Sequence, residues 1–511
     1  MISSGLNLKP EVRNRKSERT PNPETRKFPV TSRFLKALFR PECHADFNPW
    51  ISRFFRFTGV RIRITDFRPK ALLILFLASR LFDFTATAAA KPYGLTVRPE
   101  AKSFLQMPPR ADGSLPPLLS GTGAFVDPRR MIASDGLIPY DLIVPFWSDG
   151  AEKARWISAP GKIKFTPAGE WSFPRGTVFV KTFELATNEN DPRSLRRLET
   201  RLLVCDETGG VYGVTYKWRP DNRDADLLAT NLTEAIAIQT ATGVRTQLWY
   251  YPSRQDCLTC HTPNAGLVLG VKARQLNRDF AFASGVTDNE LRAWNHIGLF
   301  DTNLDETALE TLPKLARTDD ASRSLEDRAR SYLDANCANC HRPNGTVAYF
   351  DARYETPLAR QNLIGGNVLI DQRIDGARVI APNDAWRSIL FMRANTTEPF
   401  KMPPLARNTI DERGMKLLRQ WIESLPGPPT LAPPEISPRG GNYEKPVEVV
   451  LKTEPGATIR YTLDGTVPGQ SDALYTEPIR LAAPTILRAK AFKAGFTKSI
   501  TTQEIFLVNT P

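Results

Sequence analysis

The sequence predicts a multidomain protein in which a β-rich N-terminal domain precedes a helical part and a C-terminal all-β sandwich. A length of 511 residues is more than one ordinary domain needs. Short runs rich in Val, Thr, Phe and Tyr dominate as far as residue 255, and helical spacing of apolar residues follows. A proline-rich linker at 426–434 then precedes short alternating runs in 435–511.

The first ninety residues differ from the rest of the chain in charge. Residues 1–70 carry sixteen Lys/Arg and six Asp/Glu, a net of +10, so only +3 of the formal +13 belongs to the remainder. A nucleic-acid-binding surface needs clustered cations on a folded face. No such cluster follows residue 91, so we expect no nucleic-acid partner.

The end of this leader, residues 1–90, resembles an export signal. "RPKALLILFLASRLFDF" joins a basic start to an apolar run, and Ala88 and Ala90 occupy the positions of an A-x-A cleavage site. Arg80 and Asp83 interrupt the apolar part, and a short amphipathic core helix is the alternative. We expect a periplasmic or secreted mature chain with no transmembrane span, since nothing later is apolar for long enough.

The β-rich domain is expected over residues 91–255. The runs 176–185, 196–205 and 211–218 are rich in β-branched and aromatic residues, and Gly209–Gly210 reads as a hairpin turn between the last two. Because strands dominate the pattern, it predicts a β-sandwich or a barrel.

Helical patterns divide the next part into segments 256–324 and 325–425. Ser324, followed by two acidic residues, is a typical helix start. Residues 410–425 place Leu417, Leu418, Trp421 and Leu425 on one helical face.

Two short motifs carry the chemistry. "CLTCH" places Cys257, Cys260 and His261 together, and "CANCH" repeats the arrangement at Cys337, Cys340 and His341. Covalent haem accounts for every position, because two thioethers fix the porphyrin and the adjacent imidazole ligates iron. We expect two covalently bound haem c groups, haem 1 at the first motif and haem 2 at the second.

Zinc and thiol redox chemistry are the alternatives for these motifs. Four thiolates can close a tetrahedral zinc site, but zinc ribbons separate their pairs by about 15–20 residues. Zinc also gives no reason for a histidine after each second cysteine. A thioredoxin-like pair would need one motif near a βαβ pattern, which the sequence lacks.

The second axial ligands are chosen from the few remaining candidates. Met402 in "FKMPPLA" lies in a loop stiffened by two prolines and is expected at haem 2. His296 is a candidate at haem 1 because it is the one histidine left outside the leader; Met107, Met131 or an open position are the alternatives.

Residues 325–425 resemble a class I cytochrome c domain. A helix runs into "CANCH", an "MPP" loop follows, and the last helix carries Trp421. This resemblance implies a helical domain in which the first and last helices cross, with Tyr332 and Trp421 at their interface.

A wider stretch, from about Pro116 to Leu425, resembles large bacterial di-haem c-type cytochromes through phrases such as "YPSRQDCLTCH" and "RARSYLDANCANCHRPNG". The tail, with "ATIRYTLDGTVPG", resembles the β-sandwich of chitobiases and β-hexosaminidases, which would dock on a glycan or a protein. We therefore expect an electron carrier between a dehydrogenase and a terminal acceptor rather than an enzyme. A di-haem peroxidase-like enzyme with a reactive haem 1 is the alternative.

Overall fold

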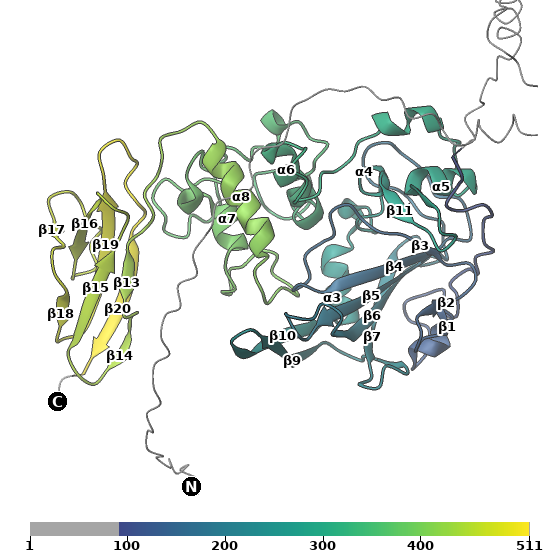
Figure 1. Cartoon of the computed structure of the whole chain (residues 1–511), viewed down its shortest axis with the longest axis horizontal. Coiled ribbons are helices and arrows are strands. Elements are labelled where there is room, and N and C mark those ends of the chain that lie inside the picture. Colours follow the sequence, from purple (N-terminus) through teal and green to yellow (C-terminus); the bar gives the residue numbers. More distant parts are fainter. Residues whose placement is uncertain (1–90, 510–511) are drawn as a thin grey trace, which may run out of the picture. The chain divides into compact units, whose positions relative to one another are not determined.

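The computed structural model describes residues 91–509, so the expected export signal lies outside the described residues. The largest element is a six-stranded antiparallel sheet in the order β3-β4-β5-β6-β7-β8 (Figure 1). Its strands are β3 (Ile138–Pro139), β4 (Glu152–Ser158), β5 (Val178–Ala186), β6 (Leu195–Cys205), β7 (Val211–Trp218) and β8 (Ala225–Leu227).

The three predicted β-runs form β5, β6 and β7, and Gly209 makes the expected turn with a positive φ of 92°. Smaller strands flank the sheet. These are the β1–β2 pair (Phe125–Asp127, Ile132–Ala133), the β9–β10 hairpin (Leu232–Thr240, Gly243–Tyr251) and the β11–β12 pair (Asp279–Ala281, Thr287–Asn289).

The sequence predicts a β-sandwich or a barrel here, and that prediction is wrong. The sheet is an open meander, and β3 and β8 do not pair with each other. One face packs instead against helices that follow it in sequence, so that Ile157 and Phe179 share a core with Leu291 and Trp294. Local strand patterns predict a sheet but do not say what buries its face. Segment 256–324 thus contributes to the core of the β-rich part.

The helical part holds few and short helices. They are α3 (Arg254–Cys260), α4 (Ala273–Leu276), α5 (Glu290–His296), α6 (Leu325–Asn336), α7 (Ile389–Ala394) and α8 (Glu412–Ser424), with single 3-10 turns η2 (Pro263–Ala265), η3 (Glu306–Thr311), η4 (Leu358–Arg360) and η5 (Ala385–Arg387); a further 3-10 turn, η1 (Leu119–Thr122), lies in the β-rich part. Among these helices, none has the length and apolarity that crossing a bilayer requires.

Helices α6 and α8 pack against each other. Ser324 caps α6 by accepting a hydrogen bond from the Asp327 amide, as its sequence predicts. Tyr332 and Trp421 lie in one core with Leu417 and Leu418. Gly414 permits the close approach, since a Cβ there would lie 2.5 Å from the Tyr332 ring.

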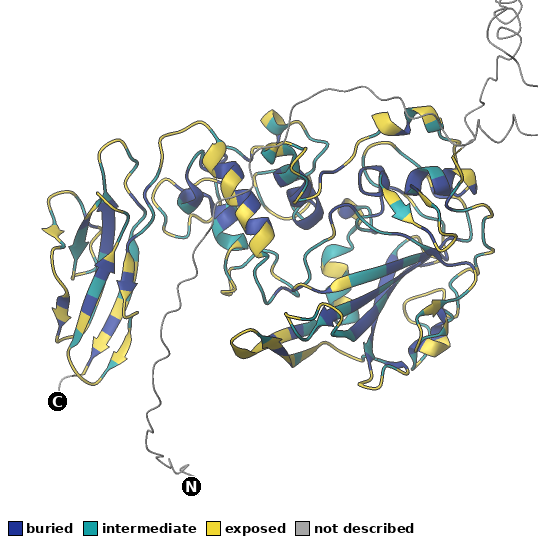
Figure 2. Ribbon diagram, in the orientation of Figure 1, coloured by how far each residue is buried: buried dark blue, intermediate teal, exposed yellow. Residues whose placement is uncertain are grey.

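The C-terminal module is a two-layer β-sandwich around its own core. A three-stranded sheet, β13-β15-β18, faces a five-stranded sheet, β14-β20-β19-β16-β17. Buried and exposed residues alternate along its strands (Figure 2). The strands are β13 (Glu435–Ser437), β14 (Gly441–Tyr443), β15 (Val447–Lys452), β16 (Thr458–Thr462), β17 (Ala473–Leu474), β18 (Ile479–Leu481), β19 (Thr485–Phe492) and β20 (Thr502–Val508).

Candidate functional site

Both cysteine motifs fold into the same local turn at the end of a helix. The His261 amide donates to the carbonyl of Cys257 over 3.0 Å, and the His341 amide donates to the carbonyl of Cys337 over 2.9 Å. In each case one helical turn gathers two thiols and an imidazole. The cysteines are free thiols rather than disulfides.

The first motif is held against the large sheet by α3. Ser253 and Asp256 form a reciprocal capping box that starts the helix. Gly213 on β7 leaves room for the Cys257 thiol, because a Cβ there would lie 2.6 Å from Sγ. The His261 Nδ1 lies 2.7 Å from the carbonyl oxygen of Leu267. This bond fixes the proton on Nδ1 and leaves Nε2 free to ligate a metal.

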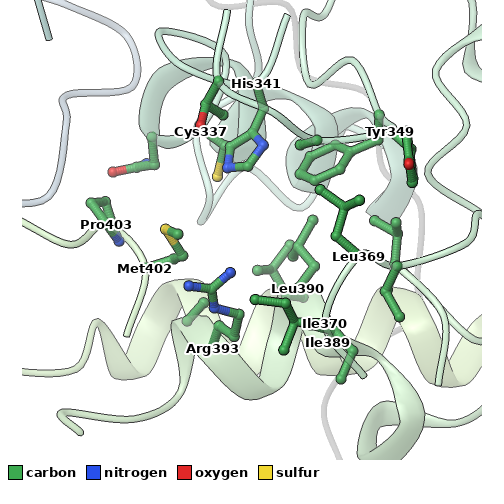
Figure 3. A pocket seen from close by; sticks show the side chains of 18 of the residues that line it. Cys337, His341, Tyr349, Leu369, Ile370, Ile389, Leu390, Arg393, Met402 and Pro403 are labelled. Carbon is green, nitrogen blue, oxygen red and sulfur yellow. The ribbon is translucent and has the colours of Figure 1, made fainter. Parts of the chain in front are cut away.

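The second motif opens onto a cavity that we call the Met402 cavity. Cys337, His341 and Met402 all line it, and Figure 3 shows Met402 and Arg393 across the space from Cys337 and His341. It encloses about 1110 Å³ of empty space, partly open to solvent. The rest of its wall is mostly apolar, with Tyr332, Val347, Phe350, Val368, Leu369, Ile370, Ile389, Leu390 and Leu418.

The loop carrying Met402 is anchored from the β-rich part. The buried carboxylate of Asp149 accepts hydrogen bonds from the amides of Asn408 and Thr409, at 2.8 Å and 2.9 Å. The Met402 amide itself donates to the carbonyl of Arg393 over 2.8 Å. These bonds hold the loop in place and so fix the position of the Met402 thioether in the cavity.

The first motif opens onto a second cavity, which we call the Lys181 cavity. It encloses about 870 Å³, and Cys257, Cys260 and His261 line it together with Lys181. Tyr140, Phe179, Leu203 and Val268 supply much of the remaining wall. Leu405 and Ala406 also line it, so the loop that presents Met402 touches both cavities.

The two motifs meet between the cavities. The Cys260 thiol hydrogen-bonds the Cys340 sulfur, which lowers the pKa of Cys340 and raises that of Cys260. Arg342 bridges the motifs, donating to the carbonyl of Asn264 and to Glu170, each over 2.8 Å. Cys340 therefore faces Cys260 and not the Met402 cavity, and a covalent bond to a group in that cavity requires its side chain to rotate.

A buried ion network joins the same regions. Asp334 at the end of α6 lies 2.9 Å from Arg274 and 3.6 Å from Lys272, and Arg274 also pairs with Glu355 at 2.8 Å. Despite burial, which opposes ionisation, these cations lower the pKa of Asp334 to about 2.

Both histidines are neutral imidazoles near pH 7. Burial lowers the pKa of His261 to about 4, and nearby Lys181 and Arg201 act in the same direction. Burial likewise lowers the pKa of His341 to about 4. Neutral imidazole is the form that ligates metals.

The residues present fit a haem better than a bare metal ion. Within residues 91–509 no three His, Cys, Asp or Glu side chains converge as a metal site requires. Each cavity instead pairs a largely apolar wall with thiols and an imidazole. The His341 Nδ1 is buried without a hydrogen-bond partner in the described part of the chain. Its ring stacks on Phe350, with centroids 4.3 Å apart.

The other sequence candidates lie elsewhere. His296 ends α5 as expected, but it is exposed and stacks on Tyr93 with ring centroids 3.4 Å apart, away from either cavity lining. Met107 is buried in a separate core, and Met131 packs against that core. The structure therefore brings none of the three to His261.

Sequence reasoning missed Lys181, Arg201 and Gly213, all of which line the Lys181 cavity. One signal existed for the lysine. It is a lone cation inside the apolar run "VFVKTF", where a buried strand would otherwise carry a hydrophobic side chain.

Comparison with known proteins identifies one module. Residues 438–503 match the family model of the chitobiase/beta-hexosaminidase C-terminal domain. This match agrees with the sandwich formed by β13–β20. No curated protein sequence is significantly similar to the chain.

Proposed function

We propose that the chain is a di-haem c-type cytochrome that transfers electrons outside the cytoplasm. The observation that carries this is the pair of identical Cys-x-x-Cys-His turns, each with its histidine lining a separate cavity. Helices α6 and α8, packed around Tyr332 and Trp421, support a class I cytochrome c arrangement at the second motif.

Bound haem supplies a one-electron iron couple. Cys257 and Cys260 would hold one haem with His261 as its ligand, and Cys337 and Cys340 would hold the other with His341 and Met402. The protein's part is to orient each imidazole, exclude water with the apolar walls, and keep the two motifs adjacent through Arg342, which donates to the carbonyl of Asn264. That adjacency supports electron passage from one site to the other.

The external partners follow from this role. A dehydrogenase would donate electrons and a terminal acceptor would receive them in the periplasm or outside the cell. The C-terminal module would dock on a glycan or a partner protein. The outward residues Ile486, Ile505 and Leu507 are each at least 39 % exposed, and these aliphatic side chains suit a protein surface better than sugar stacking. Truncation after residue 430 should abolish docking and leave the haem content unchanged.

Haem content of paired variants tests the cofactor. The wild-type protein, expressed with haem-attachment machinery, should show two haems per chain in its reduced spectrum. C257S/C260S and C337S/C340S should each retain one, with spectra that differ because the second ligands differ. C205S is the matched control, since Cys205 is a buried thiol outside both motifs. Zinc in place of iron would contradict the proposed function.

A peroxidase-like enzyme is the second candidate. It is favoured by one observation, which is that among residues 91–509 no second histidine or methionine lines the Lys181 cavity. An open iron position there would permit peroxide to bind. Peroxide turnover together with a high-spin ferric signal from the first haem would support this candidate, and two low-spin haems would exclude it.

A further inference from the structure

Three cations stand in one row across the large sheet. Arg155 on β4 is directly opposite Lys181 on β5, and Lys181 is directly opposite Arg201 on β6. Like charges in directly opposed positions destabilise a sheet. Such a conflict with the fold marks a place where the residue serves another purpose.

The two outer members of the row have carboxylate partners. Arg155 pairs with Asp141. Arg201 pairs with Glu199, its Nε lying 2.9 Å from Oε2. Lys181 in the middle makes no ion pair or side-chain hydrogen bond among the described residues; its Nζ lies 5.1 Å from the ring centroid of Phe183. Arg201 approaches the same ring more closely, at 4.4 Å.

Lys181 is half-buried, and a lysine withdrawn from water without a paired carboxylate is expensive to keep protonated. Burial, the two neighbouring arginines and Lys153 lower the pKa of Lys181 well below its ordinary value. The amine then carries a free lone pair. A lone pair held in a largely apolar cavity can ligate a metal.

Lys181 enters the cavity from β5, whereas His261 enters it from the turn after α3. The two donors thus come from different walls of one space. Tyr140 is the other neutral donor on that wall, but burial raises the pKa of its phenol well above the ordinary value. The phenol stays protonated and is a poor ligand.

We propose that the amine of Lys181 is the second axial ligand of the iron held by His261, a role that rests on the proposed function. It replaces His296, which the fold holds at the surface. The two haems would then differ in kind, one with imidazole and thioether, the other with imidazole and amine. A filled second position also argues against the peroxidase-like candidate.

Low-temperature electron paramagnetic resonance and near-infrared magnetic circular dichroism of the ferric protein test this assignment. The wild type should show two low-spin haems in equal amounts, one with the signature of amine ligation. K181R places an always-charged guanidinium in the cavity and offers no lone pair, so half of the low-spin signal should become high-spin. K181A should do the same, and added methylamine should restore the low-spin signal.

K153R is the matched control. Lys153 is a half-buried lysine on β4 whose Nζ donates to the carbonyl of Ala151 over 3.1 Å, and it does not line the cavity. Its variant should keep both low-spin signals. An unchanged spectrum in K181R would overturn the assignment and leave Lys181 as a partner of the haem propionates.

If the Lys181 variants do not fold, the wild-type spectrum decides alone, because a high-spin or bis-imidazole first haem contradicts amine ligation. Two haem masses with such a spectrum would reject the ligand and keep the proposed function. Absence of haem from Cys257 and Cys260 would reject the proposed function itself.

Discussion

The two cavities share a motif and differ in what faces it. The Met402 cavity is surrounded by helices and loops of residues 325–425 and presents a neutral thioether to His341. The Lys181 cavity is formed against an antiparallel sheet, whose residues Lys181 and Arg201 line it together with His261. One five-residue motif therefore lies in two unrelated surroundings. The surroundings, rather than the motif, determine the properties of each site.

Removing the buried carboxylate of Asp334 should have the largest effect on stability. D334A removes the carboxylate that pairs with both Lys272 and Arg274. The free energy of unfolding should therefore fall by about 3–5 kcal/mol. Denaturant titration measures this. E423A removes an exposed pair with Arg419 and should cost less than about 1 kcal/mol. Equal effects for the two variants would show that the network does not hold the cavities together.

Replacing Gly213, which lies against the first motif, with alanine should disturb the Lys181 cavity and leave the Met402 cavity unchanged. G213A places a Cβ 2.6 Å from the Cys257 sulfur, so α3 must shift, at about 1–3 kcal/mol. Haem attachment at Cys257 and Cys260 should fall, and attachment at the second motif should persist. G441A is the control, because its nearest heavy atom would lie 3.9 Å away. Equal loss at both motifs would contradict independent cavities.

The free energy of unfolding should also depend on pH through the buried carboxyl group of Glu290. Burial raises the pKa of Glu290 to about 8, and its Oε1 accepts the Asp141 amide at 2.7 Å. The folded state holds this proton and the unfolded state releases it, so stability should fall as pH rises from about 4.5 to 8. One proton gives a slope of at most about 1.4 kcal/mol per pH unit. E290Q should flatten the slope measured by denaturant titrations across this range, and an unchanged slope would assign it to other groups.

Replacing Met402 should change the reduction potential of the second haem, with little change in the free energy of unfolding. M402A removes the sulfur facing His341, and thioether ligation raises haem potentials. Because axial ligands span about 0.8 V, we expect the second haem's potential to fall by on the order of 0.1 V. Spectroelectrochemical titration should show the first haem unmoved. A shift confined to the first haem would reverse the assignment of the cavities.

The sequence predicts the parts of the site that depend on local chemistry. Both sets of two cysteines and a histidine form the same turn at the end of a helix, and Met402 is recognisable from its stiff proline loop. Counting the remaining histidines favours His296, but the count ignores where α5 lies. Lys181 was missed because its cavity is built from strands and turns far apart in the chain. The sheet was predictable from its β-runs, but its covering helices were not.

Intact-mass measurement of the mature protein tests the central claim most directly. We predict two added haem masses, one on the peptide with Cys257 and Cys260 and one on the peptide with Cys337 and Cys340, and an N-terminus near Lys91. A colourless protein of unmodified mass, with four titratable thiols in these motifs, would contradict it.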